Sequence, residues 1–109
     1  MPFFMVQAAY SATSWAAMVK SPEDREKAFR QLIEKAGCKL VSFYFCFGED
    51  DVVGILEAPD NATAALVAIT ASGTGHLRNY RTTPLLTVEE TLGIMRKAGD
   101  ISGGTKKTS

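Results

Sequence analysis

Side chains capable of acid–base or ligand chemistry gather between residues 42 and 57. Successive side chains of a strand alternate between its two faces, so a strand carrying Ser42 and Tyr44 presents both hydroxyls on one face. A neighbouring strand that ends at Glu57 would add a carboxylate to that face. A phenol and a carboxylate held together could bind a polar ligand or exchange a proton, whereas the more common role of such a pair is a hydrogen-bond network at a subunit interface. Ser42, Tyr44 and Glu57 are therefore candidate ligand contacts.

A second group of candidates follows two glycines, Gly73 and Gly75. His76 and Arg78 come next, so glycine amides and cationic side chains could bind an anion at this corner. The segment has neither the phosphate-binding loop pattern nor the dinucleotide glycine pattern. A mobile basic loop without a ligand is the simpler interpretation, and His76 and Arg78 are kept as candidate ligand contacts beside it.

Two further side chains have chemistry of their own but no evident partner. Trp15 is expected in a loop before the first helix, where it could cover a cavity or pack at a subunit interface. Cys46 is expected on the face of Tyr44. Since there is no CxxC pair and no second histidine, a packed thiol is favoured over a reactive one. Both join the candidate ligand contacts, and no catalytic residue is identified.

Metal binding is not expected. Glu49, Asp50 and Asp51 form an acidic turn whose carboxylates could bind calcium or magnesium. The full calcium-loop pattern is absent, however, and turns collect aspartate for local hydrogen bonding. One histidine and two cysteines are too few for a self-contained zinc site. We expect no metal and no cofactor.

Composition excludes several classes of function. The chain has 109 residues with 12 basic and 12 acidic side chains, so its formal net charge is zero, whereas nucleic-acid binders usually carry a basic surplus. No apolar run approaches the roughly 20 residues of a membrane helix. If Cys38 and Cys46 belong to the same strand, they lie too far apart to form a disulfide. Two free thiols in turn indicate a reducing compartment. We expect a cytoplasmic protein that binds neither nucleic acid nor membrane.

The elements that would position these residues begin with a strand at about residues 3–10. A helix follows, with Ser21 as its N-cap, Pro22 at its first position and Gly37 as its stop. The pattern then predicts two hairpin strands, at residues 39–47 and 51–58, and a second helix at residues 61–72 that Asp60 caps. A fourth strand is predicted at residues 76–83 and a last helix at residues 88–98.

This order, β-α-β-β-α-β plus a terminal helix, predicts an α+β fold of the ferredoxin-like kind. Its four-stranded antiparallel sheet should carry both main helices on one face. Thr87 and Glu90 match a capping box that opens the last helix, and Gly99 is expected to close it. We therefore expect one domain over residues 1–98 and a flexible tail over residues 99–109.

The expected hairpin also predicts which residues share a face. With Glu49 and Asp50 as the turn, Tyr44 would lie opposite Ile55 and Ser42 opposite Glu57. The other face is wholly apolar and should lie under the helices; it carries Val41, Phe43, Phe45, Phe47, Val52, Gly54 and Leu56. The face of Tyr44 mixes polar groups with Val53 and Ile55, and exposed apolar sheet of this extent usually finds a partner. We therefore expect a homo-oligomer.

The chain resembles the GYD-domain proteins, which are small bacterial and archaeal proteins. The resemblance rests on Ser21-Pro22 with Arg25, on Gly37-Cys38-Lys39-Leu40, and on Tyr44 followed by residues 47–53 and 57–60. It implies a ferredoxin-like fold of the dimeric α+β-barrel type. The family motif is normally Gly-x-Tyr-Asp, and here Asp50 stands at the tyrosine position while Asp51 keeps the aspartate. The family has no assigned biochemical role, so no catalytic residue transfers.

Two classes of function are compatible with these observations. The first is a non-catalytic protein that binds a small molecule or serves as an assembly module. The second is a cofactor-independent enzyme, of the monooxygenase or isomerase kind that the dimeric α+β-barrel fold often hosts, which rests on fold analogy. A cavity containing Glu57 or His76 would favour ligand chemistry, and a dry, filled interface would favour assembly alone.

Overall fold

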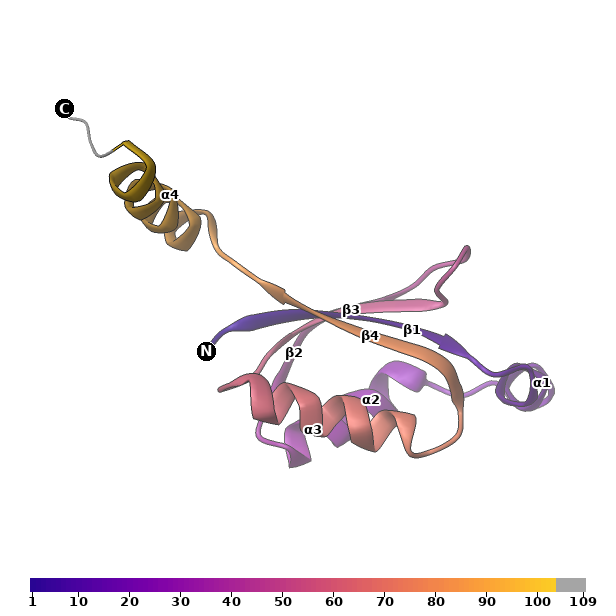
Figure 1. Ribbon diagram of the computed structural model, residues 1–109. Coiled ribbons are helices and arrows are strands. Elements are labelled where there is room, and N and C mark those ends of the chain that lie inside the picture. Colours follow the sequence, from indigo (N-terminus) through magenta and orange to yellow (C-terminus); the bar gives the residue numbers. More distant parts are fainter. Residues whose placement is uncertain (104–109) are drawn as a thin grey trace.

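The computed structural model describes residues 1–103, and the elements follow one another as Figure 1 shows. Residues 104–109, the end of the expected tail, lie outside the described part. The elements are β1 (Phe3–Tyr10), α1 (Ala12–Lys20), α2 (Arg25–Lys35), β2 (Lys39–Phe45), β3 (Val52–Glu57), α3 (Asn61–Ser72), β4 (Leu77–Leu85) and α4 (Val88–Gly103).

The four strands form one antiparallel sheet in the order β2-β3-β1-β4, with β1 and β3 in its centre. Both α2 and α3 cover one face of this sheet, and the other face is open (Figure 1). This arrangement confirms the predicted ferredoxin-like α+β fold. The main core lies between the sheet and these two helices, because alternate side chains of the central strands point there. Its most deeply buried members are Phe4, Ile33, Leu40, Leu56, Ala58 and Val67.

The segment before α2 differs from the prediction. Residues 12–20 form a helix, α1, with Ser11 as N-cap, so Trp15 lies on a helix and not in a loop. Ser21 ends α1, and Asp24 caps α2 by accepting a hydrogen bond from the Lys27 amide at 3.0 Å. The predicted cap at Ser21 was therefore wrong by three residues, because Asp24 supplies the same side-chain acceptor immediately before the apolar stripe.

The β2–β3 register also differs from the prediction. Tyr44 lies opposite Val53 and Ser42 opposite Ile55, because the connection between the strands is centred on Gly48 and Glu49 and not on Glu49 and Asp50. An irregularity at Val41 then brings Lys39 opposite Glu57. Val41 is consequently half exposed, and the buried position under the helices belongs to its neighbour Leu40.

The end of β2 departs from the expected face as well. The strand ends at Phe45, so Cys46 and Phe47 belong to the connection. Phe47 is 99% exposed and does not lie under the helices. Cys46 is an exposed free thiol whose Sγ donates to the Asp50 carbonyl oxygen at 3.3 Å.

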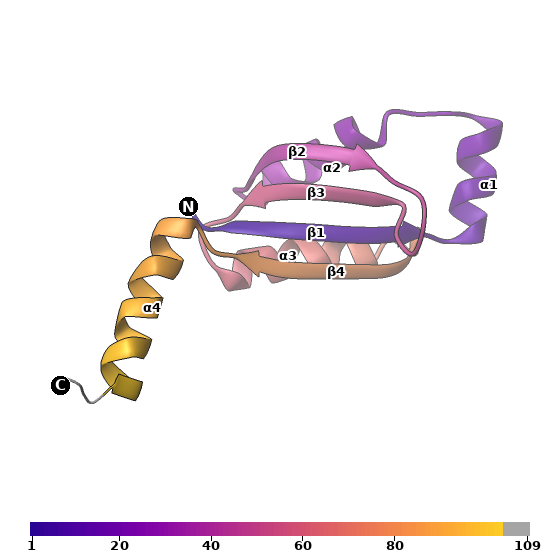
Figure 2. The ribbon, with the colours of Figure 1, turned by 90° about the horizontal axis from the view of Figure 1, so that it is seen from above.

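The helix α4 projects from the end of β4, away from the sheet and at the opposite end from α1 (Figure 2). The predicted capping box is present: the Thr87 amide donates to Glu90 Oε1 at 2.8 Å, and the Glu90 amide donates to Thr87 Oγ1 at 3.0 Å. Gly99 does not close the helix, which continues to Gly103. No residue of α4 is buried, so the other residues that the structure describes leave the apolar side chains of this helix uncovered.

Candidate functional site

The structure does not bring Tyr44 and Glu57 together. Both belong to the open face, but Tyr44 lies opposite Val53, whereas Glu57 lies opposite Lys39 at the far end of β3. Four residues separate Val53 from Glu57, which corresponds to about 13 Å along a strand. Tyr44 is 68% exposed. The expected phenol–carboxylate pair is therefore absent from the described residues, although Ser42, Val53 and Ile55 do share a face with Tyr44.

The hairpin carboxylate at the family's tyrosine position is buried. Asp50 is only 8% exposed, forms an ion pair with Arg81 Nη2, and accepts from Gln7 Nε2 at 3.5 Å. Its other oxygen, Oδ1, is buried without a hydrogen-bond partner in the described chain. Arg78 donates from Nη2 to the Glu49 carbonyl at 3.2 Å. Both arginines after His76 thus contact the hairpin.

The second motif carboxylate anchors α1 to the sheet. Asp51 Oδ2 accepts hydrogen bonds from the Tyr10 amide at 2.8 Å and from Trp15 Nε1 at 3.0 Å. The Trp15 ring meets the Tyr10 ring edge-on, with 5.5 Å between centroids. Asp51 and Trp15 therefore have a structural role at the end of β1. Among the described residues, no three histidine, cysteine, aspartate or glutamate side chains are grouped to hold a metal ion.

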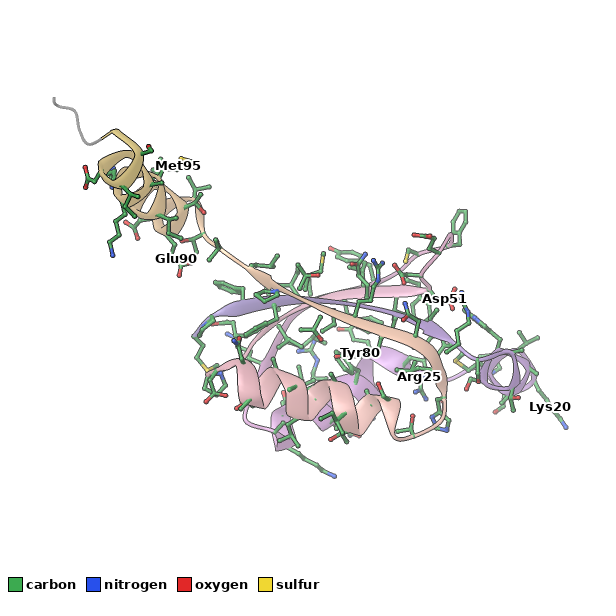
Figure 3. The ribbon with its side chains drawn as sticks, in the orientation of Figure 1. Lys20, Arg25, Asp51, Tyr80, Glu90 and Met95 are labelled. Carbon is green, nitrogen blue, oxygen red and sulfur yellow. The ribbon has the colours of Figure 1, made fainter. Side chains whose placement is uncertain are left out.

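A cavity of about 300 Å³ lies on the helix side of the sheet, between the four strands on one side and α2 and α3 on the other. Most of its wall is apolar, from Val6, Ala8, Ala28, Phe29, Leu32, Phe43, Val52, Ala71 and Leu77. Polar groups come from Tyr10, Arg25, Thr70, Thr74, His76 and Tyr80. Figure 3 shows Tyr80 and Arg25 on the side of the sheet that faces these helices.

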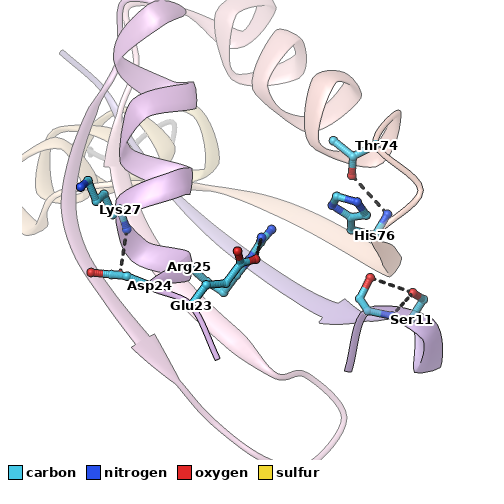
Figure 4. Close-up of polar contacts among 8 residues, drawn as sticks. Ser11, Glu23, Asp24, Arg25, Lys27, Thr74 and His76 are labelled. Atoms are coloured by element: carbon cyan, nitrogen blue, oxygen red, sulfur yellow. Dashed lines mark hydrogen bonds and ion pairs between the residues drawn. The ribbon is translucent and has the colours of Figure 1, made fainter. Parts of the chain in front are cut away.

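A smaller recess of about 200 Å³ adjoins the cavity on the side of α1. Tyr10, Arg25 and His76 line both spaces, so these three residues form the polar boundary between them. Asp24 places Arg25 at the first position of α2, and Gly75, with a φ of 78°, turns the chain into His76. Figure 4 shows Arg25 and His76 on elements that face each other across this boundary.

Two groups at the cavity lack a hydrogen-bond partner in the described chain: the buried Nε of Arg25 and the buried hydroxyl of Tyr80. Arg25 Nη1 donates to Glu23 Oε1 at 2.6 Å, and its guanidinium carbon lies 5.6 Å from the Tyr10 ring centroid. Burial lowers the pKa of Arg25, but the nearby Glu23 carboxylate and Tyr10 phenol outweigh it and raise that pKa. Burial also raises the pKa of the Tyr80 phenol. Arg25 is thus charged and Tyr80 neutral at pH 7.

Of the predicted site residues, only His76 lines the cavity, and the sequence analysis missed Tyr10, Arg25 and Tyr80. One signal for Arg25 was present in the sequence. Arg25 lies three and four residues before Ala28 and Phe29, which places it on the side of the helix that carries the buried stripe. Its contact with the cavity, however, depends on how α2 packs on the sheet.

Comparisons with known proteins agree with this architecture. The family model described as the GYD domain matches residues 4–95. The crystal structure of MtbAldR is similar, with a TM-score of 0.57 and 15% identity, over 79% of this chain and 53% of that one. The crystal structure of FFRP-DM1 gives a TM-score of 0.49 and 11% identity, over 79% of this chain and 100% of that chain. The matched region thus spans about half of MtbAldR, and the likeness shows the fold alone. No curated protein matches the sequence.

Proposed function

The chain belongs to the GYD-domain family, and from this premise we propose that it is a homo-oligomer that holds a small molecule in the cavity between its sheet and helices. The observation that carries the binding proposal is the cavity itself. Its volume of about 300 Å³ is about twice that of the engineered apolar cavity that admits benzene. Apolar walls with a few polar groups at one end are typical of small-molecule sites.

The proposal of an oligomer rests on two surfaces that this chain leaves uncovered. The open sheet face carries partly buried apolar residues, among them Met5, Val53 and Ile55, beside the exposed Tyr44. The helix α4 exposes Val88, Leu92 and Met95, which recur at helical spacing. The radius of gyration is 18.3 Å, against about 13 Å for a compact chain of this length. A second copy seated on the open face would cover both surfaces.

The alternative of a cofactor-independent enzyme has less support from the cavity. Its two threonine hydroxyls donate to backbone carbonyls, Thr70 to Leu66 and Thr74 to Ala71, each at 2.7 Å. The Thr74 oxygen also accepts from the His76 amide at 3.2 Å. Neither hydroxyl is therefore arranged as a nucleophile that His76 could activate. Among the described wall residues, non-catalytic binding is the better-supported role. Within residues 1–103, no helix is long and apolar enough to cross a membrane.

Filling the cavity tests the binding proposal. Ala71 is buried and lines the cavity, whereas Ala62 lies on the exposed part of the same helix. We expect benzene to raise the Tm of the wild-type protein and of Ala62→Leu. Ala71→Leu places three further carbons in the binding space, so it should weaken benzene binding about tenfold or more, which is about 1.4 kcal/mol. Thermal denaturation against benzene concentration measures both effects. Equal Tm shifts in all three proteins would refute a ligand site in this cavity.

A further inference from the structure

We infer that the cavity takes a small carboxylate with a compact apolar body, and that Arg25 receives the carboxylate group. This inference rests on the proposed function, because it names the class of molecule that the proposed site would hold. It follows from three properties of the cavity wall: the hydrogen-bond donors left without partners, the distribution of charge, and the volume.

The first property is an excess of donors. A guanidinium has five N–H donors in a fixed planar arrangement and no acceptor. Glu23 receives one of them, from Nη1, while the Nε–H of Arg25 is buried without a partner. Because Glu23 accepts from Nη1 alone, the guanidinium keeps further N–H donors, and a ligand oxygen in the cavity can accept from the side of Arg25 that Glu23 does not occupy.

The second property is the sign of the charge. Among the described residues that line the larger cavity, no side chain is acidic, while Arg25 is cationic. Glu23 lines only the smaller recess, where it pairs with Arg25 Nη1. The Nε edge of Arg25 is thus the edge without an acidic partner. A carboxylate is the anion that a guanidinium edge binds best through planar hydrogen bonds.

The third property is the separation of polar and apolar wall within a limited volume. Tyr10, Arg25 and His76 line both the cavity and the recess beside α1, and apolar residues dominate the rest of the cavity wall. At roughly 30 Å³ for each non-hydrogen atom, about 300 Å³ accommodates about ten such atoms. These limits describe a phenyl ring or short hydrocarbon chain with one carboxylate, not a nucleotide or a long fatty acid.

The test compares 3-phenylpropanoate with 3-phenylpropanamide, which has the same number of non-hydrogen atoms and no charge. Isothermal titration at pH 7 should show that the wild-type protein binds the carboxylate about tenfold or more tightly than the amide. Arg25→Gln should lose this preference while retaining its affinity for the amide, which also shows that the variant is folded. Arg30→Gln is the matched control, because Arg30 belongs to the same helix, pairs with Glu26 and lies outside the cavity wall.

The possible outcomes separate the two proposals. Equal affinity of the wild-type protein for the carboxylate and the amide would overturn the inference of an anionic ligand, while binding in the cavity would stand. A preference that survives Arg25→Gln would overturn the role of Arg25. If the carboxylate, the amide and benzene all fail to bind the wild-type protein, the proposed function itself fails.

Discussion

Substituting Ile55 by lysine is expected to convert the oligomer into monomers. Ile55 lies on the central strand β3, opposite Met5 of β1 and Ser42 of β2, on the open face of the sheet. In a face-to-face assembly, Ile55→Lys would bury a charge without a partner. A cost of about 4 kcal/mol is typical of an uncompensated buried charge and corresponds to about a thousandfold weaker association. Light scattering across a concentration series measures the change.

The fold of the single chain should tolerate this substitution, since the side chain of Ile55 points away from the core under the helices. Gln31→Lys is the matched control, because Gln31 is exposed on α2, on the covered side of the sheet. The control should keep the wild-type mass. An Ile55→Lys protein of unchanged mass and unchanged Tm would show that this face does not form the interface.

The second large effect is expected on α4. Met95 is 59% exposed and lies in one stripe with Val88 and Leu92. Met95→Asp should dissociate the oligomer, or weaken it about a hundredfold, because the stripe would lose its apolar surface and bury a carboxylate. The far-UV circular dichroism of the protein should not change, since no residue of α4 is buried among the described residues. Sedimentation velocity against concentration measures the association.

Lys97→Asp provides the control for α4. Lys97 lies nine residues after Val88, which at 100° per residue places it on the opposite side of the helix. Its charge change is larger than that of Met95→Asp, yet it should leave association nearly unchanged. If Lys97→Asp dissociates the protein as strongly as Met95→Asp, net charge and not the apolar stripe explains the effect.

The elements that the sequence predicted closely are those with local signals. β1 and α3 have the predicted bounds, because β1 is an uninterrupted strand-forming segment and α3 begins at the Asp60 cap, whose Oδ1 accepts from the Thr63 amide at 2.8 Å. The capping box at Thr87 likewise depends only on residues within one turn. Such signals require no knowledge of distant parts of the chain.

The errors lie mainly where residues far apart in sequence meet. The hairpin register was wrong by two residues because the centre of the connection was placed one residue too late, next to Asp50, which pairs with Arg81 of β4. The helix α1 was missed although its Ser11 cap is a local signal; its tie to the sheet, from Trp15 to Asp51, joins residues 36 apart. The cavity was missed because its wall combines all four strands with α2 and α3, and only their packing brings Tyr10, Arg25 and Tyr80 together.

Native mass spectrometry of the freshly purified protein and of Ala71→Leu shows whether the protein is an oligomer that holds a small molecule in its cavity. It reports the number of subunits and any retained small molecule in one spectrum. Because two identical faces that pack on each other are related by a twofold axis, we predict a dimer or a multiple of it. We further predict a bound mass of about ten non-hydrogen atoms per subunit, detached by activation and missing from Ala71→Leu. A monomer without bound mass would contradict the account, as would a ligand retained equally by both proteins.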